Sequence, residues 1–198
     1  MSSTVCKKNI RQSIRAQRRA LSNAEQQLAA LAVRDHLNHW SEFRRAKRLA
    51  FYLANDGEVQ TDAAIDLAWS RKQSVFLPVI QSFHFNRMRF SGFTKKTILS
   101  ANRFGILEPV HKTVALQTVM SLHMVFMPLV AFDAKGARLG MGGGFYDRSF
   151  AFLLNRQSWR QPKLIGLAHD FQQVQQLQME AWDVPLHAVV TPAGITRF

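Results

Sequence analysis

The chain has 198 residues, 47% of them hydrophobic and 20% charged, which is the composition of a folded globular protein and excludes a disordered chain. The single cysteine, Cys6, excludes an intrachain disulfide and a cysteine-based zinc site, and no apolar run approaches the roughly 18 residues of a membrane span. We therefore expect one domain over residues 1–198, acting as a monomer in the reducing cytoplasm without membrane association.

The first quarter of the chain carries most of the positive charge. Residues 1–50 hold eleven Lys and Arg against three acids, which gives +8 of the formal net charge of +13. Such clustering suits nucleic acids and equally suits polyanionic small molecules. No helix-turn-helix, zinc-finger or RRM-type aromatic signature accompanies the charge, so we favour small molecules and keep nucleic-acid binding as the alternative.

An amphipathic helix is predicted at the start of the chain. Its apolar stripe comprises Ile10, Ile14 and Leu21. Its basic stripe recurs at steps of four or three and comprises Lys7, Arg11, Arg15 and Arg18. Aligned like charges repel by a few tenths of a kcal/mol per pair, a cost that a helix accepts more readily beside an anion. A solvated basic face nevertheless accounts for Arg15, Arg18 and Arg19.

A second helix is expected to begin at the capping box formed by Ser22 and Glu25, with Leu28, Leu31, Leu37 and Trp40 facing the core. Residues 48–53 form a strand candidate, and residues 55–58 the turn that follows. Ligands of open α/β sheets collect beyond the carboxyl ends of the strands, which is where Glu58 falls. From the residues alone, Glu58 is equally well a functional carboxylate or a loop acid.

Alternating helices and strands continue along the chain. Thr61 is expected to cap a helix reaching about residue 70, and residues 74–80 form a strand that Pro78 limits to an edge or a strand end. Residues 83–93 interleave aromatic and basic side chains, which is typical of a stacking platform for single-stranded nucleic acid. Their period-two alternation favours a half-buried strand instead.

Residues 124–149 combine an apolar strand, a glycine loop and the start of a helix. Residues 124–132 are continuously apolar, as a strand covered on both faces requires, and residues 133–136 form a turn. Four glycines then precede a helix expected from residue 145 to about 156: Gly140, Gly142, Gly143 and Gly144. Glycines let backbone N–H groups approach an anion, and Arg138 and Arg148 flank them, so we favour an anion cradle over a flexible turn.

The C-terminal part supplies two further strands. Residues 163–168 form one, with His169 and Asp170 at its end, where loop polarity is our preferred account over acid–base work. Residues 172–180 are predicted to be a polar helix or loop, and Asp183 precedes a last strand near residues 186–190. No GxxxxGK[ST], GxGxxG, GxSxG or metalloprotease histidine pair occurs, so P-loop, dinucleotide-binding, serine-hydrolase and zincin sites are excluded.

The stretch RLGMGGGFYD, residues 138–147, resembles the signature of the 5-formyltetrahydrofolate cyclo-ligase family, also called methenyltetrahydrofolate synthetases. Four further segments resemble that family in the expected order: KKNIR (7–11), DGEVQT (56–61), FGILEP (104–109) and WDVP (182–185). The resemblance spans nearly the whole chain. It implies an α/β three-layer sandwich, in which a mainly parallel sheet carries helices on both faces and the site lies at the strand carboxyl ends.

The resemblance also implies a reaction. 5-Formyltetrahydrofolate, a reduced folate, is cyclised to 5,10-methenyltetrahydrofolate with ATP and Mg²⁺ as cofactors and with release of ADP and phosphate. A formamide oxygen is a poor leaving group, and its phosphorylation creates a good one, after which N10 closes the ring.

Roles follow from the family's motifs, residue by residue. Cofactor binding falls to Lys7, Lys8, Arg11, Arg138, Leu139, Gly140, Met141, Gly142, Gly143, Gly144, Phe145 and Tyr146. Substrate binding falls to Arg11, Leu53, Glu58, Met141, Gly142, Gly143, Gly144 and Phe145. Asp147 and Asp183 are the expected magnesium ligands, and Arg11, Arg138 and Tyr146 the catalytic residues. Met141 and Phe145 stand where many relatives carry tyrosine, which leaves open a related enzyme with an altered substrate.

Overall fold

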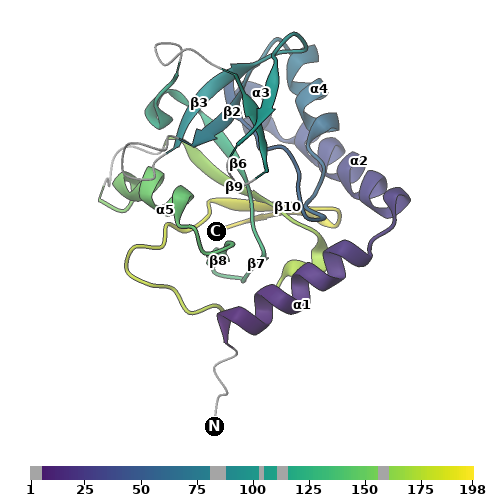
Figure 1. Ribbon diagram of the computed structural model, residues 1–198, viewed down its shortest axis with the longest axis vertical. Coiled ribbons are helices and arrows are strands. Elements are labelled where there is room, and N and C mark those ends of the chain that lie inside the picture. The colour runs from purple at the N-terminus through teal and green to yellow at the C-terminus, as the bar shows by residue number, and fades with distance from the viewer. Residues whose placement is uncertain (1–5, 81–87, 103–104, 111–115, 156–160) are drawn as a thin grey trace.

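In this computed structural model, which describes residues 6–80, 88–102, 105–110, 116–155 and 161–198, seven strands form a central sheet (Figure 1). These strands are β1 (Arg48–Ala50), β2 (Ser74–Ile80), β3 (Met88–Phe93), β6 (Met124–Pro128), β9 (Lys163–Leu167), β10 (Ala188–Thr191) and β11 (Gly194–Arg197). They lie in the order β11, β10, β9, β6, β1, β2, β3.

The inner strands of the sheet are parallel. β10, β9, β6, β1 and β2 run in one direction, while β11 and β3 pair antiparallel at the two edges. β6 lies in the middle, with Met124 opposite both Leu49 of β1 and Lys163 of β9. This central place explains the unbroken apolar run of β6, because both of its faces are covered.

Successive side chains of each strand enter two different cores. Leu49, Phe126 and Ile165 pack under helices α2 (Asn23–His39), α3 (Ser41–Arg45) and α4 (Asp62–Ser70). Val125 and Leu164 face the other way and pack with Phe150 of α5 (Phe145–Phe150). Figure 1 shows α2 and α4 on one side of the sheet and α5 on the other. The expected three-layer α/β sandwich is confirmed.

Helix α1 (Lys7–Ala20) does not belong to either layer. It lies across the carboxyl ends of the parallel strands, beside the hairpin of β7 (Ala131–Phe132) and β8 (Arg138–Leu139) (Figure 1). Arg18 Nη1 donates to Leu129 O just beyond β6, at 3.3 Å. Ile10 packs against a small cluster that includes Leu139. The N-terminal helix therefore covers the carboxyl ends of the strands, where ligand sites of this architecture form.

A second hairpin, β4 (Leu99–Ala101) with β5 (Leu107–Pro109), packs next to β2 and β3. Glu108 Oε2 accepts a hydrogen bond from Ile80 N at 3.3 Å and so ties this hairpin to the end of β2. Among the described residues, no helix has the length and apolar character needed to cross a bilayer.

Several local predictions are confirmed. Ser22 and Glu25 form the capping box that begins α2. Asp133 closes the predicted turn before β8, because its Oδ1 accepts from Lys135 N and Ala137 N. The strand expected within residues 83–93 is present as β3 from Met88 onward, while residues 83–87 lie outside the described part, as do Phe104 and residues 114–115.

Other local predictions are wrong, each for a tertiary reason. The Thr61 hydroxyl makes no cap to α4 and donates instead to Tyr52 O at 2.7 Å. β2 is an internal strand, so the edge alternative for Pro78 is wrong, while the strand-end alternative agrees with the structure because Pro78 lies beyond Phe76, the last residue of β2 paired with β1. Leu28 is 67% exposed rather than core-facing. The helix from residue 145 is shorter than expected, because α5 ends at Phe150 and a 3-10 turn follows.

Candidate active site

The glycine loop meets the N-terminal helix. Arg11 Nε donates to Gly140 O at 2.8 Å, across 129 residues of sequence. A Cβ on Gly142 would lie 3.7 Å from Arg11 Nη2, so the guanidinium runs alongside the loop. The structure therefore brings together the basic helix and the glycines that the sequence analysis assigned to one anion site.

The loop backbone is shaped by its glycines. Gly142 and Gly144 have φ values of 99° and 61°, a region that other residues rarely adopt. Gly143 O accepts a hydrogen bond from Arg148 Nη2 at 2.5 Å. Within the described residues, the backbone N–H groups of residues 141–144 donate no hydrogen bond. Arginines thus occupy two carbonyls of the loop, and its amides stay available to an anion.

Arg138 and Asp147 form an ion pair behind the loop. Arg138 Nη2 lies 2.5 Å from Asp147 Oδ1, and the two side chains are 6% and 18% exposed. Val184 N donates to the same carboxylate oxygen at 3.2 Å, which places Asp183 next to this pair along the chain. Asp183 Oδ2 accepts from Glu180 N at 2.9 Å. The two predicted magnesium ligands are therefore joined through adjacent backbone.

The two lysines predicted to bind the nucleotide differ in their surroundings. Lys7 Nζ lies 3.4 Å from Glu180 Oε1, on the same segment that carries Asp183. Lys8 is exposed at the start of α1. Lys7 thus belongs to the group around Asp147 and Asp183, and Lys8 contributes charge at its margin.

Glu58 is held in the turn beyond β1. Asn55 N donates to Glu58 Oε2 at 3.1 Å, and Arg18 Nη1 lies 3.9 Å from Glu58 Oε1. Burial raises the pKa of Glu58 to about 7, although the hydrogen bond from Asn55 and the charge of Arg18 act in the opposite direction. A carboxyl with this pKa exists in both protonation states near neutrality, which suits contact with a polar substrate.

Tyr146 lies close enough to Glu58 for their charges to interact. The pKa of Tyr146 is raised, first by burial and then by the charge of Glu58, while Arg138 lowers it. Its ring stacks with that of Phe150, at 6.3 Å between centroids. The described residues give no hydrogen-bond partner to its hydroxyl. Glu58 and Tyr146, predicted from segments almost ninety residues apart, therefore share one region.

The apolar members of the predicted site take different places. Phe145 packs against the second core, and its ring would lie 2.9 Å from a Cβ on Gly143. Met141 is 53% exposed at the tip of the loop. Leu53 packs against the core under α2, α3 and α4, just past β1. Leu139 is 5% exposed and packs in the small cluster that Ile10 of α1 joins.

Sequence reasoning missed the polar support beneath this site. Arg18 is 1% exposed rather than part of a solvated face, and His169 and Gln172 are 4% and 1% exposed rather than polar loop residues. Gln172 Nε2 donates to Leu129 O and Val130 O at 2.7 and 2.9 Å. Burial lowers the pKa of His169, which lies 3.2 Å from Gly57 O. Periodicity along one helix or loop cannot show that a distant segment covers it.

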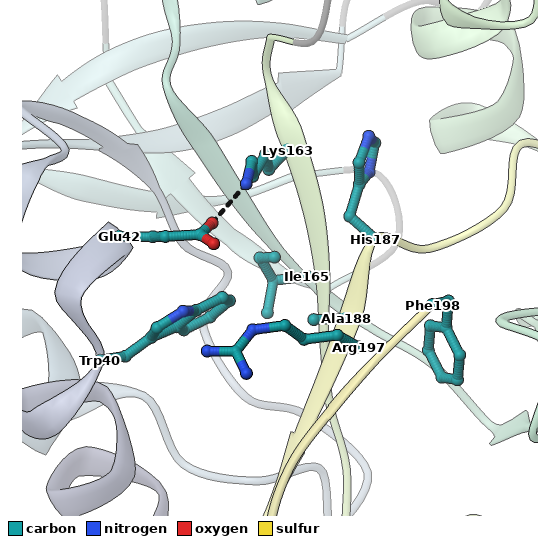
Figure 2. A pocket seen from close by; sticks show the side chains of 8 residues that line it. All are labelled: Trp40, Glu42, Lys163, Ile165, His187, Ala188, Arg197 and Phe198. Atoms are coloured by element: carbon teal, nitrogen blue, oxygen red, sulfur yellow. Dashed lines mark hydrogen bonds and ion pairs between the residues drawn. The ribbon is translucent and has the colours of Figure 1, made fainter.

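A cleft of about 360 Å³ lies elsewhere, at the amino-terminal ends of the parallel strands. Figure 2 shows its lining: Trp40, Glu42, Lys163, Ile165, His187, Ala188, Arg197 and Phe198. Lys163 pairs with Glu42 across it, and the Arg197 guanidinium lies 5.6 Å from the Trp40 ring centroid. None of the predicted site residues lines this cleft. Ligands of open α/β sheets bind at the carboxyl ends of the strands, opposite to this cleft. The candidate active site is therefore the one beside α1.

Comparison with known proteins agrees with the resemblance seen in the motifs. The model of the 5-formyltetrahydrofolate cyclo-ligase family matches residues 3–192. The chain belongs to this family. A 5-formyltetrahydrofolate cyclo-ligase of Haemophilus influenzae is 39% identical over 186 residues, which cover 93% of this chain and 96% of that protein. The Escherichia coli protein of the same name is 37% identical over 184 residues, covering 92% and 98% of the two chains.

Solved structures of the family share the fold. The NMR structure of 5,10-methenyltetrahydrofolate synthetase from Aquifex aeolicus superposes with a TM-score of 0.79 at 28% identity, covering 98% of this chain and 93% of that one. A 5,10-methenyltetrahydrofolate synthetase from Mycoplasma pneumoniae gives 0.71 at 22% identity, over 95% and 99% of the two chains. The overall fold of the chain is therefore that of the family.

Proposed function

We propose that this protein is an ATP- and Mg²⁺-dependent ligase that cyclises 5-formyltetrahydrofolate to 5,10-methenyltetrahydrofolate, releasing ADP and phosphate. Family membership supports the reaction. The observation that carries the site assignment is the hydrogen bond from Arg11 to Gly140 O, because it joins the two motifs that would hold a triphosphate. We further propose that the enzyme works as a single-domain monomer in the cytoplasm.

The phosphates would lie between the glycine loop and the arginines. The free amides of residues 141–144 and the cationic side chains of Lys7, Arg11 and Arg138 are the donors that a polyphosphate requires. Lys8 adds positive charge nearby. Arg11 and Arg138 are each held by a contact within the protein, so little reorganisation would accompany the growth of charge on a transferring phosphoryl group.

The residues present fit a magnesium ion. Mg²⁺ is commonly held by one or two carboxylates, with substrate phosphates and water completing its shell. Asp147 and Asp183 each engage one carboxylate oxygen in the hydrogen bonds described above, and each retains another oxygen. Among the described residues no group of three or more His, Cys, Asp or Glu forms a metal cage, so the nucleotide would supply the remaining ligands.

The folate would occupy the space beside Glu58 and the aromatic start of α5. Bound ATP supplies the phosphoryl group that makes the formyl oxygen a leaving group. The Glu58 carboxylate accepts a hydrogen bond at the pterin end of the substrate, Arg138 and Arg11 hold the phosphate side, and Tyr146 lies within the electrostatic reach of both Glu58 and Arg138. Leu53 and residues 141–145 supply apolar contact and exclude water from the reacting atoms.

The direct test mixes the protein with Mg²⁺, ATP and 5-formyltetrahydrofolate and follows the absorbance of the methenyl product. The proposal expects turnover only when all components are present, and expects ADP to form in equal amount. ADP formation without methenyl product would show a different acceptor. A panel of related folates would then reveal whether Met141 and Phe145, which lack the hydroxyl of tyrosine, change the substrate.

A further inference from the structure

The turn that carries Glu58 is held by contacts with elements distant in sequence. Asp56 and Gly57 both have positive φ, 52° and 72°, so the chain makes a tight left-handed bend here. Gly57 O lies 3.0 Å from Gln26 Nε2 of α2 and 3.2 Å from His169 Nε2. A Cβ on Gly57 would come within 2.6 Å of Arg18 O. The turn thus fits directly against α1.

Arg18 reaches from α1 into the centre of this arrangement. Its side chain is 1% exposed, Nη2 lies 3.0 Å from Asp56 Oδ2, and Nη1 lies 3.3 Å from Leu129 O. Nη1 is also 3.9 Å from Glu58 Oε1, and that side chain is 14% exposed. One guanidinium therefore touches the turn at Asp56, the end of the central strand, and the carboxylate proposed to contact folate.

Stability alone does not explain a buried arginine at this position. Its Nε is buried without a hydrogen-bond partner in the described residues, which is costly for a charged group. Asp56 is already paired with Arg15 and Arg19, and Leu129 O already accepts from Gln172. The contact of Arg18 that no other cation duplicates in the described part of the chain is the one with Glu58.

We propose that Arg18 is a positioning residue of the active site, which locks the Glu58 turn under α1 and sets a fixed positive charge beside the Glu58 carboxylate. The inference rests on the proposed function, since Glu58 is the substrate contact that Arg18 serves. Arg18 itself is sealed from solvent and does not touch the substrate.

The charged and titratable groups around Glu58 come from every element that packs there. They are Arg18 of α1, Asp56 of the same turn, Tyr52 after β1 and Tyr146 of α5. His169, after β9, contacts the neighbouring Gly57 O. Burial is the main cause that raises the pKa of Glu58, Asp56 raises it further, and Arg18 lowers it. Removal of the Arg18 charge therefore raises the pKa of Glu58 above its present value near 7.

The first test reads Glu58 directly and needs no turnover. The chain has five glutamates, so selective ¹³C labelling of their carboxyl groups gives few signals, and Glu58→Gln identifies the one for residue 58. We expect Arg18→Met to move the midpoint of that signal upward by about one pH unit, an order set by an opposite charge near 4 Å. Arg18→Lys, which keeps the charge, should restore most of the difference.

Arg15→Met is the matched control, because Arg15 pairs with the same Asp56 carboxylate and no contact joins it to Glu58. Its Glu58 midpoint should equal that of the wild type. If Arg18→Met fails to fold, Arg18→Gln is the second neutral variant. An unchanged Glu58 midpoint in the neutral variant, or an equal shift in Arg15→Met, would overturn the proposal.

The second test follows ADP release against pH. With the Glu58 midpoint one unit higher, the charged fraction at pH 7 falls from about half to about a tenth, so kcat/KM should fall about fivefold at pH 7 and recover at higher pH. If kcat/KM instead falls by the same factor at all pH values, and the acidic side of the pH profile does not shift, Arg18 has a merely structural role and the proposal is overturned. A wild type without turnover would refute the proposed function, while the ¹³C titration would still decide the role of Arg18.

Discussion

Glu58 links pH to stability through one side chain. Burial raises its folded pKa to about 7, above the ordinary value of 4.5 for an exposed glutamate. Between these values the folded state binds more protons than the unfolded state, so the free energy of unfolding decreases as pH rises from about 4.5 through 7. The two pKa values differ by about 2.5, which corresponds to a change in the free energy of unfolding of at most about 3–4 kcal/mol.

Glu58→Gln removes this titration. We therefore expect the free energy of unfolding of the variant, measured relative to the wild type, to be higher at pH 8 than at pH 4. Urea denaturation at the two pH values measures the difference. Asp66→Asn is the control, because its carboxylate is 63% exposed and stays in water in both states. Equal effects of Glu58→Gln at both pH values would contradict the assignment of a buried, raised carboxyl.

The arginines and the aspartate of the phosphate region give a second prediction at this scale. We expect Arg11→Ala, Arg138→Ala and Asp147→Asn each to lower kcat/KM by about 10²–10³, the usual cost of removing one preorganised charge partner. The methenyl absorbance assay measures the loss, and circular dichroism checks that the fold persists. Arg34→Ala, which removes a surface pair with the adjacent Asp35, should keep wild-type turnover. Wild-type rates in all three variants would refute the site.

The role of a residue could be predicted where a short sequence motif carried it, and could not where contacts from distant segments decided it. Arg11 and the glycines were assigned to one site because each belongs to a short motif, and the structure brings them into contact. Arg18 lies seven residues beyond Arg11 on the same helix, yet it was assigned to a solvated face. Its burial is caused by Asp56 and Leu129, which approach from other segments, and no periodicity within α1 records that approach.

At the scale of elements, the fit of α1 against the turn after β1 makes a sharp prediction. Gly57→Ala should cost about 2 kcal/mol or more, because alanine is strained at this positive φ and its Cβ would lie 2.6 Å from Arg18 O. Urea denaturation measures the loss. Gly92→Ala in β3 is the matched control, since nothing lies within 4 Å of its Cβ and its φ is not positive. Equal stability of the two variants would show that α1 is not seated on Gly57.

The start of α2 gives a smaller prediction. Ser22→Ala removes the capping box and should cost about 1 kcal/mol. Chemical denaturation measures it. Ser41→Ala is the control, because Ser41 is exposed and its side chain has no hydrogen bond in the described residues. If Ser41→Ala lowers the free energy of unfolding as much as Ser22→Ala does, loss of the cap does not explain the effect.

Elements were predictable where their own sequence decides them. The capping box fixes the start of α2 by contacts within four residues. Thr61 shows the opposite case, because its hydroxyl is drawn to Tyr52 O by the packing of the β1 segment against α4. The amphipathic pattern of residues 145–156 likewise did not show that α5 ends at Phe150 and continues as a 3-10 turn.

For the whole molecule, the class of fold followed from alternating strands and helices together with the family resemblance. The strand order did not, since it depends on which way each crossover turns, and both β9 and β1 had sequences suited to several positions. The edge pairing of β3 with β2 and of β11 with β10 also rests on contacts that no single segment encodes.

The net charge of +13 leads to a prediction about the entire surface. If the charge collects ATP and anionic folates, the KM for ATP should rise with ionic strength, because salt screens exposed cations over about 8–10 Å. Steady-state kinetics between 50 and 300 mM salt, roughly the range over which screening changes most, measures this. Tight binding of duplex or single-stranded nucleic acid, falling steeply with log salt, would instead favour the alternative function.

The position of α1 across the carboxyl ends of the parallel strands has a consequence for biosynthesis. A ribosome makes Arg11 and Arg18 more than a hundred residues before their partners Gly140 and Leu129. Contacts of α1 with Asp56 and Gly57 can form early in synthesis, but its contacts with Leu129 and Gly140 cannot. The proposed phosphate site is therefore completed only after the glycine loop has been made and has met α1.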